Sequence, residues 1–269
     1  MKEIVEARAN ASCIEAPLFI QALSVEVRVG GRTTTILRSV DLTVAPGTIC
    51  GLIGESGSGK TTLARAVLGI LPRNFAVAAG SISVAGQSVA GAGTPVAYVP
   101  QDPSTALDPL FTIGAQINDL LRARRPDLRT RRARRACAFE LLEAVHLPEA
   151  RQILARRPHE VSGGQRQRLM IALALMTKPA LIVADEPTTA LDLTIQAQIL
   201  RLIRQLADAH HLAVLLTTHD PGVAHEVCDM LAVMYRDRIV EVAPTARLLR
   251  APEHPYTRQL LAPRAGGTP

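Results

Sequence analysis

One eight-residue segment constrains the fold of this chain more than any other. It reads Gly54-Glu55-Ser56-Gly57-Ser58-Gly59-Lys60-Thr61 and matches the phosphate-loop pattern G-x-x-x-x-G-K-[ST]. The apolar run at residues 49–53 predicts a buried strand before it, and residues 62–71 predict a helix that begins at about Gly59. Glycines let consecutive backbone N–H groups surround phosphate oxygens, and the helix adds the positive end of its dipole. The segment therefore predicts a nucleoside triphosphate site.

Two side chains of this segment have expected chemical roles. The chain has only three lysines among 30 basic residues, yet the position that must place a compact charge on the terminal phosphates is Lys60. The hydroxyl of Thr61 can ligate Mg²⁺. The expected nucleotide-binding residues here are Gly54, Glu55, Ser56, Gly57, Ser58, Gly59, Lys60, Thr61 and Thr62.

The composition is that of a globular protein. Its 269 residues are 48% hydrophobic and 20% charged, and the longest apolar stretches fall short of a membrane span. Residues 1–17 lack the apolar block of a secretory signal, and we interpret them as a tail. The four cysteines are dispersed without a C-x-x-C pair, which favours a reducing cytoplasm over a zinc or iron–sulfur site.

The net charge of +6 comes largely from one arginine-rich segment at residues 122–135. Aromatic residues make up only 3% of the chain, and no helix-turn-helix, zinc-finger or aromatic RNA-binding pattern is present, so nucleic acid is not an expected partner. Two interpretations of the arginines remain open, a solvated helical face or a face turned to anionic lipid headgroups.

The order of expected elements indicates an α/β domain with an insertion. Strands are expected at residues 18–29, 36–44, 81–85, 95–99, 181–185 and 213–218, with an antiparallel hairpin at residues 229–242. Between residues 102 and 178 only helices are expected, at residues 113–124, 130–145, 149–157 and from about 165 to 177. A helix over residues 192–209 then resumes the strand–helix alternation.

Polar side chains follow three of these expected strands. The run Leu181-Ile182-Val183-Ala184 ends in Asp185 and Glu186, at the carboxyl edge where α/β proteins bind ligands. Asp185 can hold Mg²⁺, and Glu186 can polarise an attacking water as a general base. Gln101 and His219 end two other strands, where the amide can contact Mg²⁺ or water and the imidazole lies near the γ-phosphate. Each is a weak signal alone, but together on one edge they favour a catalytic role.

A second glycine-bearing turn, Ser162-Gly163-Gly164-Gln165, precedes a helix about a hundred residues from the phosphate loop. Such a turn is a second anion site on the same chain. Two copies arranged head to tail would place the loop of one copy opposite the serine-glycine turn of the other.

Together these motifs closely resemble the nucleotide-binding subunit of ABC transporters over about residues 18–262. The residues that carry the resemblance are Gly54–Thr61, Gln101, Val161–Gln165, Ala180–Glu186, Ala190-Leu191-Asp192 and His219. The resemblance implies a P-loop ATPase core with an antiparallel β subdomain, a helical subdomain inserted at about residues 102–178, and tails at residues 1–17 and 263–269. It also implies a cytoplasmic ATPase, peripheral to the membrane, that closes as a dimer around two Mg·ATP.

The resemblance assigns further roles to the matched residues. Gln101 would be the lid glutamine, His219 the switch histidine, and Asp192 a support of the dimer interface, while Ser162, Gly163, Gly164 and Gln165 would contact the partner's ATP. Expected magnesium ligands are Thr61, Gln101 and Asp185. Expected partners are a second ATP-binding subunit, identical or different, two transmembrane permease subunits, and a solute-binding protein reached through the permease.

Two features narrow the resemblance to the peptide/nickel import group. They are Pro187-Thr188-Thr189-Ala190-Leu191-Asp192 with Gln196-Ala197-Gln198, and the tail His254-Pro255-Tyr256-Thr257, which packs as a short helix in that group. Gly69-Ile70-Leu71-Pro72, and the lack of a cysteine-rich extension after Leu261, favour the nickel or metal-chelate branch over the peptide branch by a small margin. Val29 stands where the family usually has an aromatic residue that stacks on adenine, so weaker base binding is expected, unless Arg28 or Arg32 stacks instead.

Two other functions fit parts of this pattern. One is an ATPase of a non-transport enzyme assembly, such as the phosphonate carbon–phosphorus lyase system, which shares the His-Pro-Tyr-Thr tail. The other is a soluble ribosome-associated ABC protein, although such proteins usually carry two cassettes on one chain and this sequence has one phosphate loop.

Overall fold

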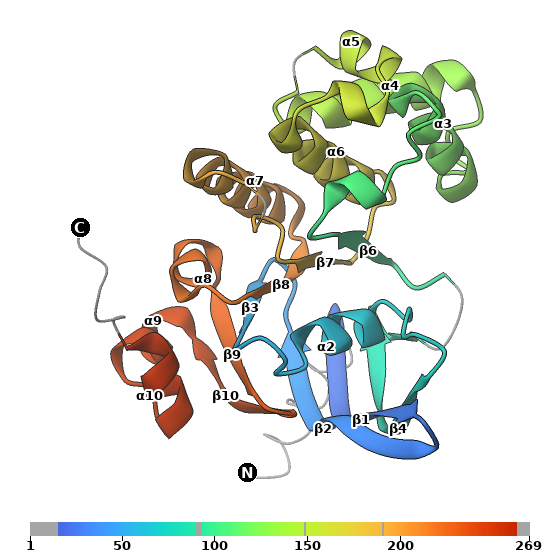
Figure 1. Cartoon of the computed structure of the whole chain (residues 1–269). Coiled ribbons are helices and arrows are strands. Elements are labelled where there is room, and N and C mark those ends of the chain that lie inside the picture. The colour runs from blue at the N-terminus through green and yellow to red at the C-terminus, as the bar shows by residue number, and fades with distance from the viewer. Residues whose placement is uncertain (1–15, 90–92, 148, 190, 263–269) are drawn as a thin grey trace, which may run out of the picture.

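The computed structural model describes residues 16–89, 93–147, 149–189 and 191–262, which form two lobes (Figure 1). Of the expected tails at residues 1–17 and 263–269, residues 1–15 and 263–269 lie outside the described residues. Ala16 and Pro17 are buried, and the Pro17 carbonyl accepts a hydrogen bond from the Ala85 amide at 3.1 Å. Packing therefore begins before Leu18, two residues earlier than the sequence indicated.

The main sheet has the strand order β10-β9-β3-β8-β7-β6. Its strands are β3 (Ile49–Ile53), β6 (Val96–Val99), β7 (Leu181–Asp185), β8 (Ala213–Thr218), β9 (Met230–Tyr235) and β10 (Arg238–Pro244). All neighbouring pairs from β9 to β6 are parallel, whereas β9 and β10 form the expected antiparallel hairpin. The carboxyl ends of β6, β7 and β8 therefore meet at one edge.

The inner strands β3, β7 and β8 of the main sheet are buried along their whole length. Ile182 and Ala184 of β7 belong to a core shared with the helices, whereas Leu181 and Val183 pack into a second core. Burial on both faces explains why this strand is a continuous apolar run rather than an alternating one.

A second, antiparallel sheet has the strand order β2-β1-β4-β5. Its strands are β1 (Leu18–Val29), β2 (Arg32–Val44), β4 (Phe75–Val84) and β5 (Gln87–Ser88). The expected strand at residues 81–85 is only the end of β4, which pairs with β1 over most of its length. This sheet confirms the expected antiparallel subdomain.

The helix after the phosphate loop, α2 (Lys60–Val67), packs in the second core, where its Leu63 belongs to one buried cluster with residues of both sheets. It ends four residues before the expected position. Gly69 has a φ of +68°, and the Ile70 amide donates to the Arg65 carbonyl at 3.0 Å. This Schellman arrangement closes the helix before the proline at residue 72 is reached.

The helical lobe, residues 102–178, contains α3 (Ile113–Arg124), α4 (Arg131–Ala144), α5 (Ala150–Ala155) and α6 (Gly163–Met176). The side chains of Thr112 and Thr130 cap α3 and α4 by accepting from backbone amides three residues on. One short 3₁₀ turn, Pro103–Thr105, precedes α3, and another, Pro158–Glu160, lies between α5 and α6. The expected helical insertion is confirmed.

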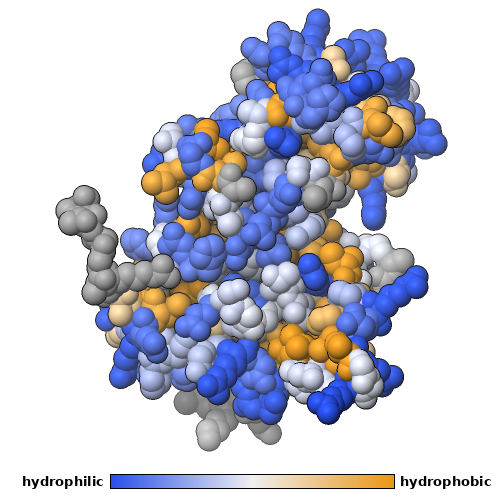
Figure 2. Space-filling view, in the orientation of Figure 1, coloured by the Kyte–Doolittle hydropathy of each residue, from blue (hydrophilic) through white to orange (hydrophobic). Residues whose placement is uncertain are grey.

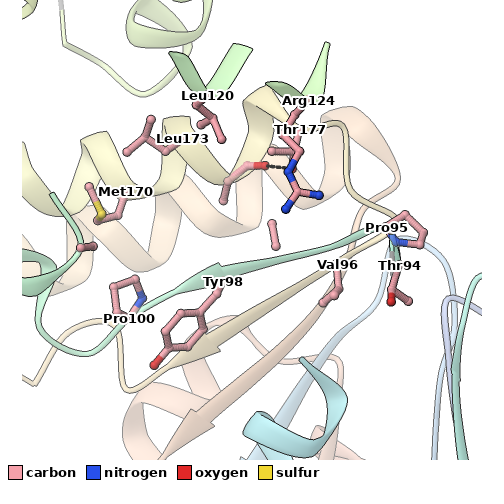
Figure 3. A pocket seen from close by; sticks show the side chains of 14 residues that line it. Thr94, Pro95, Val96, Tyr98, Pro100, Leu120, Arg124, Met170, Leu173 and Thr177 are labelled. Atoms are coloured by element: carbon pink, nitrogen blue, oxygen red, sulfur yellow. Dashed lines mark hydrogen bonds between the residues drawn. The ribbon is translucent and has the colours of Figure 1, made fainter. Parts of the chain in front are cut away.

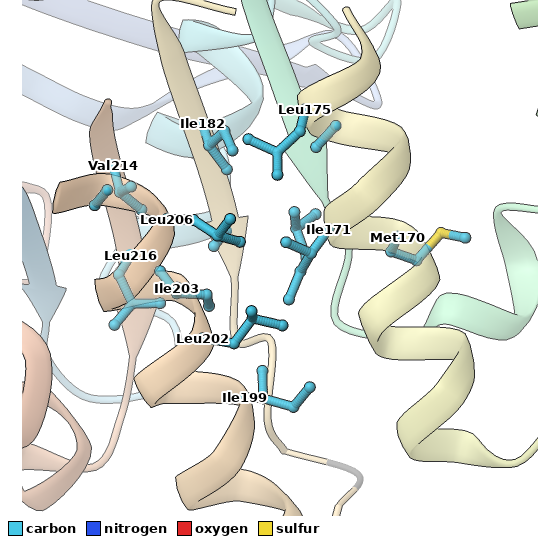
Figure 4. Packing of buried hydrophobic residues seen from close by; sticks show 14 of the residues in the cluster. Met170, Ile171, Leu175, Ile182, Ile199, Leu202, Ile203, Leu206, Val214 and Leu216 are labelled. Carbon is cyan, nitrogen blue, oxygen red and sulfur yellow. The ribbon is translucent and has the colours of Figure 1, made fainter. Parts of the chain in front are cut away.

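Four further helices follow β7: α7 (Leu193–His210), α8 (Pro221–Val227), α9 (Thr245–Arg250) and α10 (Pro255–Leu261). The helix α10 is the short helix expected for the His-Pro-Tyr-Thr tail, whereas α8 and α9 had not been predicted. Figure 4 shows how the lobes join: Ile171 of α6 and Leu206 of α7 pack together beside β7, in the same core as Ile182. The first core therefore runs from the sheet into the helical lobe.

The arginine-rich segment forms a largely solvated surface, and Figure 2 shows the helical lobe as mainly hydrophilic. Two of its arginines are instead tied to the fold. Arg125 pairs with Asp127 at 2.6 Å, and Arg134 donates to the Asn118 side chain and the Leu128 carbonyl, both at 2.9 Å. Within the described ranges, no helix combines the length and apolarity needed to cross a membrane.

Candidate nucleotide site

The phosphate loop joins β3 to α2 through glycines whose backbone other residues rarely adopt. Gly54 has a φ of +155°, and a Cβ there would lie 2.2 Å from the Met234 carbonyl oxygen. Gly59, the N-cap of α2, has a φ of +107°, and a Cβ there would lie 2.8 Å from the Leu37 side chain. The loop thus passes closely over β9 and β2, and glycine is required at both places.

Lys60 is held inside the loop. Its Nζ donates to the carbonyl oxygens of Gly54 at 2.7 Å and Glu55 at 2.9 Å, and the residue is 6% exposed. Burial lowers the pKa of Lys60, while the nearby carboxylates of Glu186 and Asp185 act to raise it. The structure therefore places the lysine within electrostatic range of both predicted carboxylates.

The rest of the loop is suited to an anionic ligand. Ser58 is 4% exposed, and its buried Oγ has no hydrogen-bond partner among the described residues. A buried hydroxyl without a partner is uncommon in folded proteins and points to a ligand contact. Thr61 and Thr62 lie in the first turn of α2, where the Thr61 side chain is exposed.

Asp185 ends β7, the residue is 6% exposed, and its carboxylate is bonded to β8. The hydroxyl of Thr217 donates to Asp185 Oδ1 at 2.5 Å. The same Thr217 Oγ1 accepts from the Glu186 amide at 3.1 Å, and the Thr217 carbonyl accepts from that amide as well. One fully buried threonine of β8 therefore orients both acidic residues at the end of β7.

Glu186 is the centre of the predicted catalytic group. It has a φ of +45°, which is rare for a residue other than glycine. Its Oε2 lies 3.2 Å from His219 Nδ1 and accepts from Gln101 Nε2 at 3.4 Å and from Thr189 Oγ1 at 2.9 Å. Gln101, Glu186 and His219, predicted on three separate strands, meet at one carboxylate.

Three residues of this site were not predicted from the sequence. Thr217 and Thr189 orient the carboxylates, and Tyr256 of α10 accepts from the Glu55 amide of the phosphate loop at 3.0 Å. Thr217 is the first of two polar residues at the end of an otherwise apolar strand, and this position was the available signal. Tyr256 belongs to the tail motif that had served only to narrow the family resemblance.

The serine-glycine turn lies at the start of α6 in the helical lobe, and Figure 1 shows α6 and α2 in different parts of the molecule. Ser162 is the N-cap: its Oγ accepts from the Gln165 amide at 3.2 Å, and Gln165 Oε1 accepts from the Ser162 amide at 3.0 Å. This capping box leaves Ser162 and Gly163 exposed at a helix N-terminus. The structure does not bring this turn to the phosphate loop of its own chain.

Asp192 lies beside that turn rather than beside the phosphate loop. Its Oδ1 accepts from the Ile195 amide at 3.0 Å and caps α7. A Cβ on Gly164 would lie 3.0 Å from the Ile195 side chain, so the starts of α6 and α7 are in close contact. Ala190 lies outside the described residues.

The donors along this edge fit a magnesium nucleotide. Mg²⁺ is usually bound by one or two carboxylates together with substrate phosphates and water. Asp185 supplies such a carboxylate, the amide of Gln101 lies at the same edge, and the hydroxyl of Thr61 lies beside the loop. Among the described residues, no group of three or more His, Cys, Asp or Glu side chains could hold an ion by itself.

The buried cysteines Cys50 and Cys228 take no part in this site. Cys50 is buried in β3, and burial raises the pKa of its thiol to about 12. Burial also raises the pKa of Cys228. Both thiols are free and protonated at neutral pH, as are structural cysteines in a core.

The phosphate loop, the carboxylate edge and the inserted helical lobe together define a P-loop ATPase of the ATP-binding cassette class. A family model described as ABC transporter matches residues 37–189. The chain belongs to the ABC transporter family.

Curated relatives extend this match over most of the chain. The chain is 43% identical over 248 residues to the oligopeptide transport ATP-binding protein OppD of Lactococcus lactis subsp. cremoris (strain SK11), covering 89% of this chain and 73% of that protein. It is 44% identical over 242 residues to the probable D,D-dipeptide transport ATP-binding protein DdpD of Escherichia coli (strain K12), covering 86% and 73%.

A solved structure shows the same fold. It is a dimeric ATP-binding cassette, MJ0796, in a post-hydrolysis state bound to ADP and Pi. The TM-score is 0.72 at 24% identity, and the match covers 85% of this chain and 98% of that one.

Proposed function

We propose that this chain is the ATP-hydrolysing subunit of a peptide importer. The observation that carries the proposal is the convergence of Gln101, Thr189 and His219 on the Glu186 carboxylate, next to the phosphate loop. The names of the two bacterial relatives point to peptide or dipeptide transport. They weigh against the nickel branch and against a non-transport enzyme assembly.

In this proposal different residues bind ATP, hold Mg²⁺ and catalyse hydrolysis. The loop amides and Lys60 bind the triphosphate, and Thr61, Gln101 and Asp185 would hold Mg²⁺, which neutralises phosphate charge when bound. Glu186 accepts the proton of the attacking water, and His219 fixes the position of the Glu186 carboxylate from the neighbouring strand. Thr217 keeps Asp185 and Glu186 in place.

The proposal also includes a second ATP-binding subunit, identical or different. Ser162 and Gly163 offer backbone and hydroxyl groups at a helix N-terminus, but on the lobe away from their own phosphate loop. A neighbouring subunit placed head to tail would bring this turn to the second face of the triphosphate. Asp192, which caps α7 beside that turn, would lie at the subunit boundary.

A permease contact is proposed for the crevice between the two lobes. The crevice has a volume of about 600 Å³ and is lined by Met170 and Leu173 of α6 and by Tyr98 and Pro100, and Figure 3 shows the Tyr98 ring directed away from α6. Burial raises the pKa of the Tyr98 phenol, and the neighbouring Asp185 carboxylate adds to the rise. A permease segment bound in this crevice, at the cytoplasmic face of the membrane, would contact Tyr98. The Tyr98 side chain in turn neighbours Asp185, the proposed magnesium ligand.

The test is the variant Glu186→Gln. A general base contributes about 10²–10⁴-fold to a rate, so ATP hydrolysis should fall by that factor while ATP binding is kept. The matched control is Glu226→Gln, which removes an exposed glutamate of α8 whose carboxylate lies 3.8 Å from Arg201. Equal hydrolysis by both variants would remove Glu186 from its proposed role.

A further inference from the structure

The C-terminal helix α10 reaches the phosphate loop across most of the sequence. Tyr256, on α10, accepts a hydrogen bond from the Glu55 amide through its phenol oxygen at 3.0 Å. The carbonyl of the same Glu55 accepts from Lys60 Nζ at 2.9 Å. One residue of the loop backbone is thus held on both sides, by the nucleotide-binding lysine and by the C-terminal helix.

The phenol of Tyr256 is itself held in place. The residue is 6% exposed, and its ring stacks on Tyr235 with centroids 4.1 Å apart and an interplanar angle of 30°. Tyr235 ends β9, which pairs with β3, the strand that leads into the loop. The Arg236 guanidinium lies 5.1 Å from the centre of the Tyr235 ring. The aromatic pair therefore links α10 to the sheet that carries the loop.

The start of α10 is anchored separately on β10. The Glu241 carboxylate accepts from the amides of Glu253 at 2.9 Å and His254 at 3.0 Å. His254 Nδ1 in turn accepts from the Tyr256 amide at 3.2 Å as the N-cap of the helix. A continuous set of contacts thus runs from β10 through the start of α10 to the loop.

We propose that Tyr256 is a positioning residue for nucleotide binding, which fixes the Glu55 peptide and thereby the phosphate loop and Lys60. A loop with several glycines has high conformational freedom, and ordering it opposes binding unless other contacts order it beforehand. The hydrogen bond from Glu55 supplies that order from outside the loop. The C-terminal helix is therefore part of the nucleotide site, although it does not contact the predicted catalytic edge.

This inference rests on the proposed function only in taking ATP as the ligand of the loop. The test is Tyr256→Phe, which keeps the stacked ring and removes the acceptor that the Glu55 amide has among the described residues. The matched control is Tyr235→Phe, because no hydrogen bond joins the Tyr235 hydroxyl to any described residue. Both variants lose one phenol oxygen from the same aromatic pair, and only one of them releases the loop.

The readouts are ATP affinity, turnover at saturating ATP, melting temperature and amide hydrogen exchange of the peptide containing Glu55. For Tyr256→Phe we expect ATP affinity to fall about 3–10-fold, the range for loss of one neutral hydrogen bond, and Glu55 exchange to quicken. Turnover at saturation should stay within about twofold, because the hydrogen bond positions the loop and takes no part in the chemistry. Tyr235→Phe should match the wild type in affinity and exchange.

Two outcomes would overturn the inference. Equal ATP affinity in the two variants would show that the hydrogen bond does not order the loop. A lower melting temperature in Tyr256→Phe without a change in affinity or exchange would show a purely structural role. If the wild-type chain itself failed to bind ATP, the proposed function would fail instead, and this result is distinguishable from the other two.

Discussion

The variant Thr217→Val tests the arrangement of the two carboxylates at the end of β7. Valine has nearly the shape of threonine, so the substitution leaves no cavity and removes only the hydroxyl. That hydroxyl is buried, donates to Asp185 at 2.5 Å, and accepts from the Glu186 amide at 3.1 Å. Both bonds are lost together.

The expected cost follows from those two bonds. A hydrogen bond to a charged group contributes about 1.5–3 kcal/mol and one between neutral groups about 1 kcal/mol. The Glu186 amide keeps its second acceptor, the Thr217 carbonyl at 3.1 Å, so the second contribution is only partly lost. We therefore expect a loss of about 2–3 kcal/mol in stability, or a melting temperature lower by roughly 5–10 °C for a chain of this size.

The assay is thermal unfolding of Thr217→Val beside Thr177→Val. Thr177 makes a single bond to the neutral carbonyl of Ala174 at 2.9 Å, so its variant should lose no more than about 1 kcal/mol. ATP hydrolysis should also fall in Thr217→Val, because Asp185 loses its orienting partner, and should be retained in Thr177→Val. Equal losses of stability in the two variants would refute the role given to Thr217.

Three further predictions follow from single sites. Gly54→Ala should abolish ATP binding, because its Cβ meets a backbone oxygen, whereas Gly57→Ala, which meets nothing within 4 Å, should show only the strain of its positive φ. Burial acts to raise the pKa of the Glu241 carboxyl, but hydrogen bonds from the Glu253 and His254 amides outweigh that effect and hold the pKa below 4.5. The stabilisation that Glu241 gives should therefore be lost as the pH falls below that value, and Glu241→Gln should reduce the loss of unfolding free energy that is measured at acid pH. Alkylation of native protein at pH 8 should spare Cys50, whose pKa burial raises to about 12, and label it only after unfolding.

The parts of the site that the sequence predicted depend on local pattern. The phosphate loop and the pair Asp185 and Glu186 are contiguous motifs, and the positions of Gln101 and His219 follow from where parallel strands end. Their meeting at Glu186 required only that β6, β7 and β8 be neighbours. In the main sheet β6, β7 and β8 are neighbours, an order that the sequence analysis did not predict.

The parts that the sequence missed depend on distant contacts or on short elements. The hydrogen bond between Glu55 and Tyr256 joins residues 201 positions apart, and no local pattern encodes it. The helix α8 has only seven residues and is specified by its Asp220 cap and the proline that follows. The early end of α2 depends on the left-handed Gly69, which local periodicity does not reveal.

We propose that ATP is bound between Lys60 of one subunit and Ser162 of its neighbour. The most direct measurement mixes two variant chains, Lys60→Ala and Ser162→Asp, each also carrying Glu186→Gln to prevent hydrolysis. Aspartate is itself a favourable N-cap, so α6 should be kept while its charge repels the triphosphate.

A mixed dimer contains one site with both lesions and one intact site. We expect ATP-dependent association, measured by energy transfer between labelled chains, to appear in the mixture and to be absent or weak for each variant alone. If the mixture associated no better than the separate variants, while the chain carrying Glu186→Gln alone associated with ATP, the shared site would be contradicted.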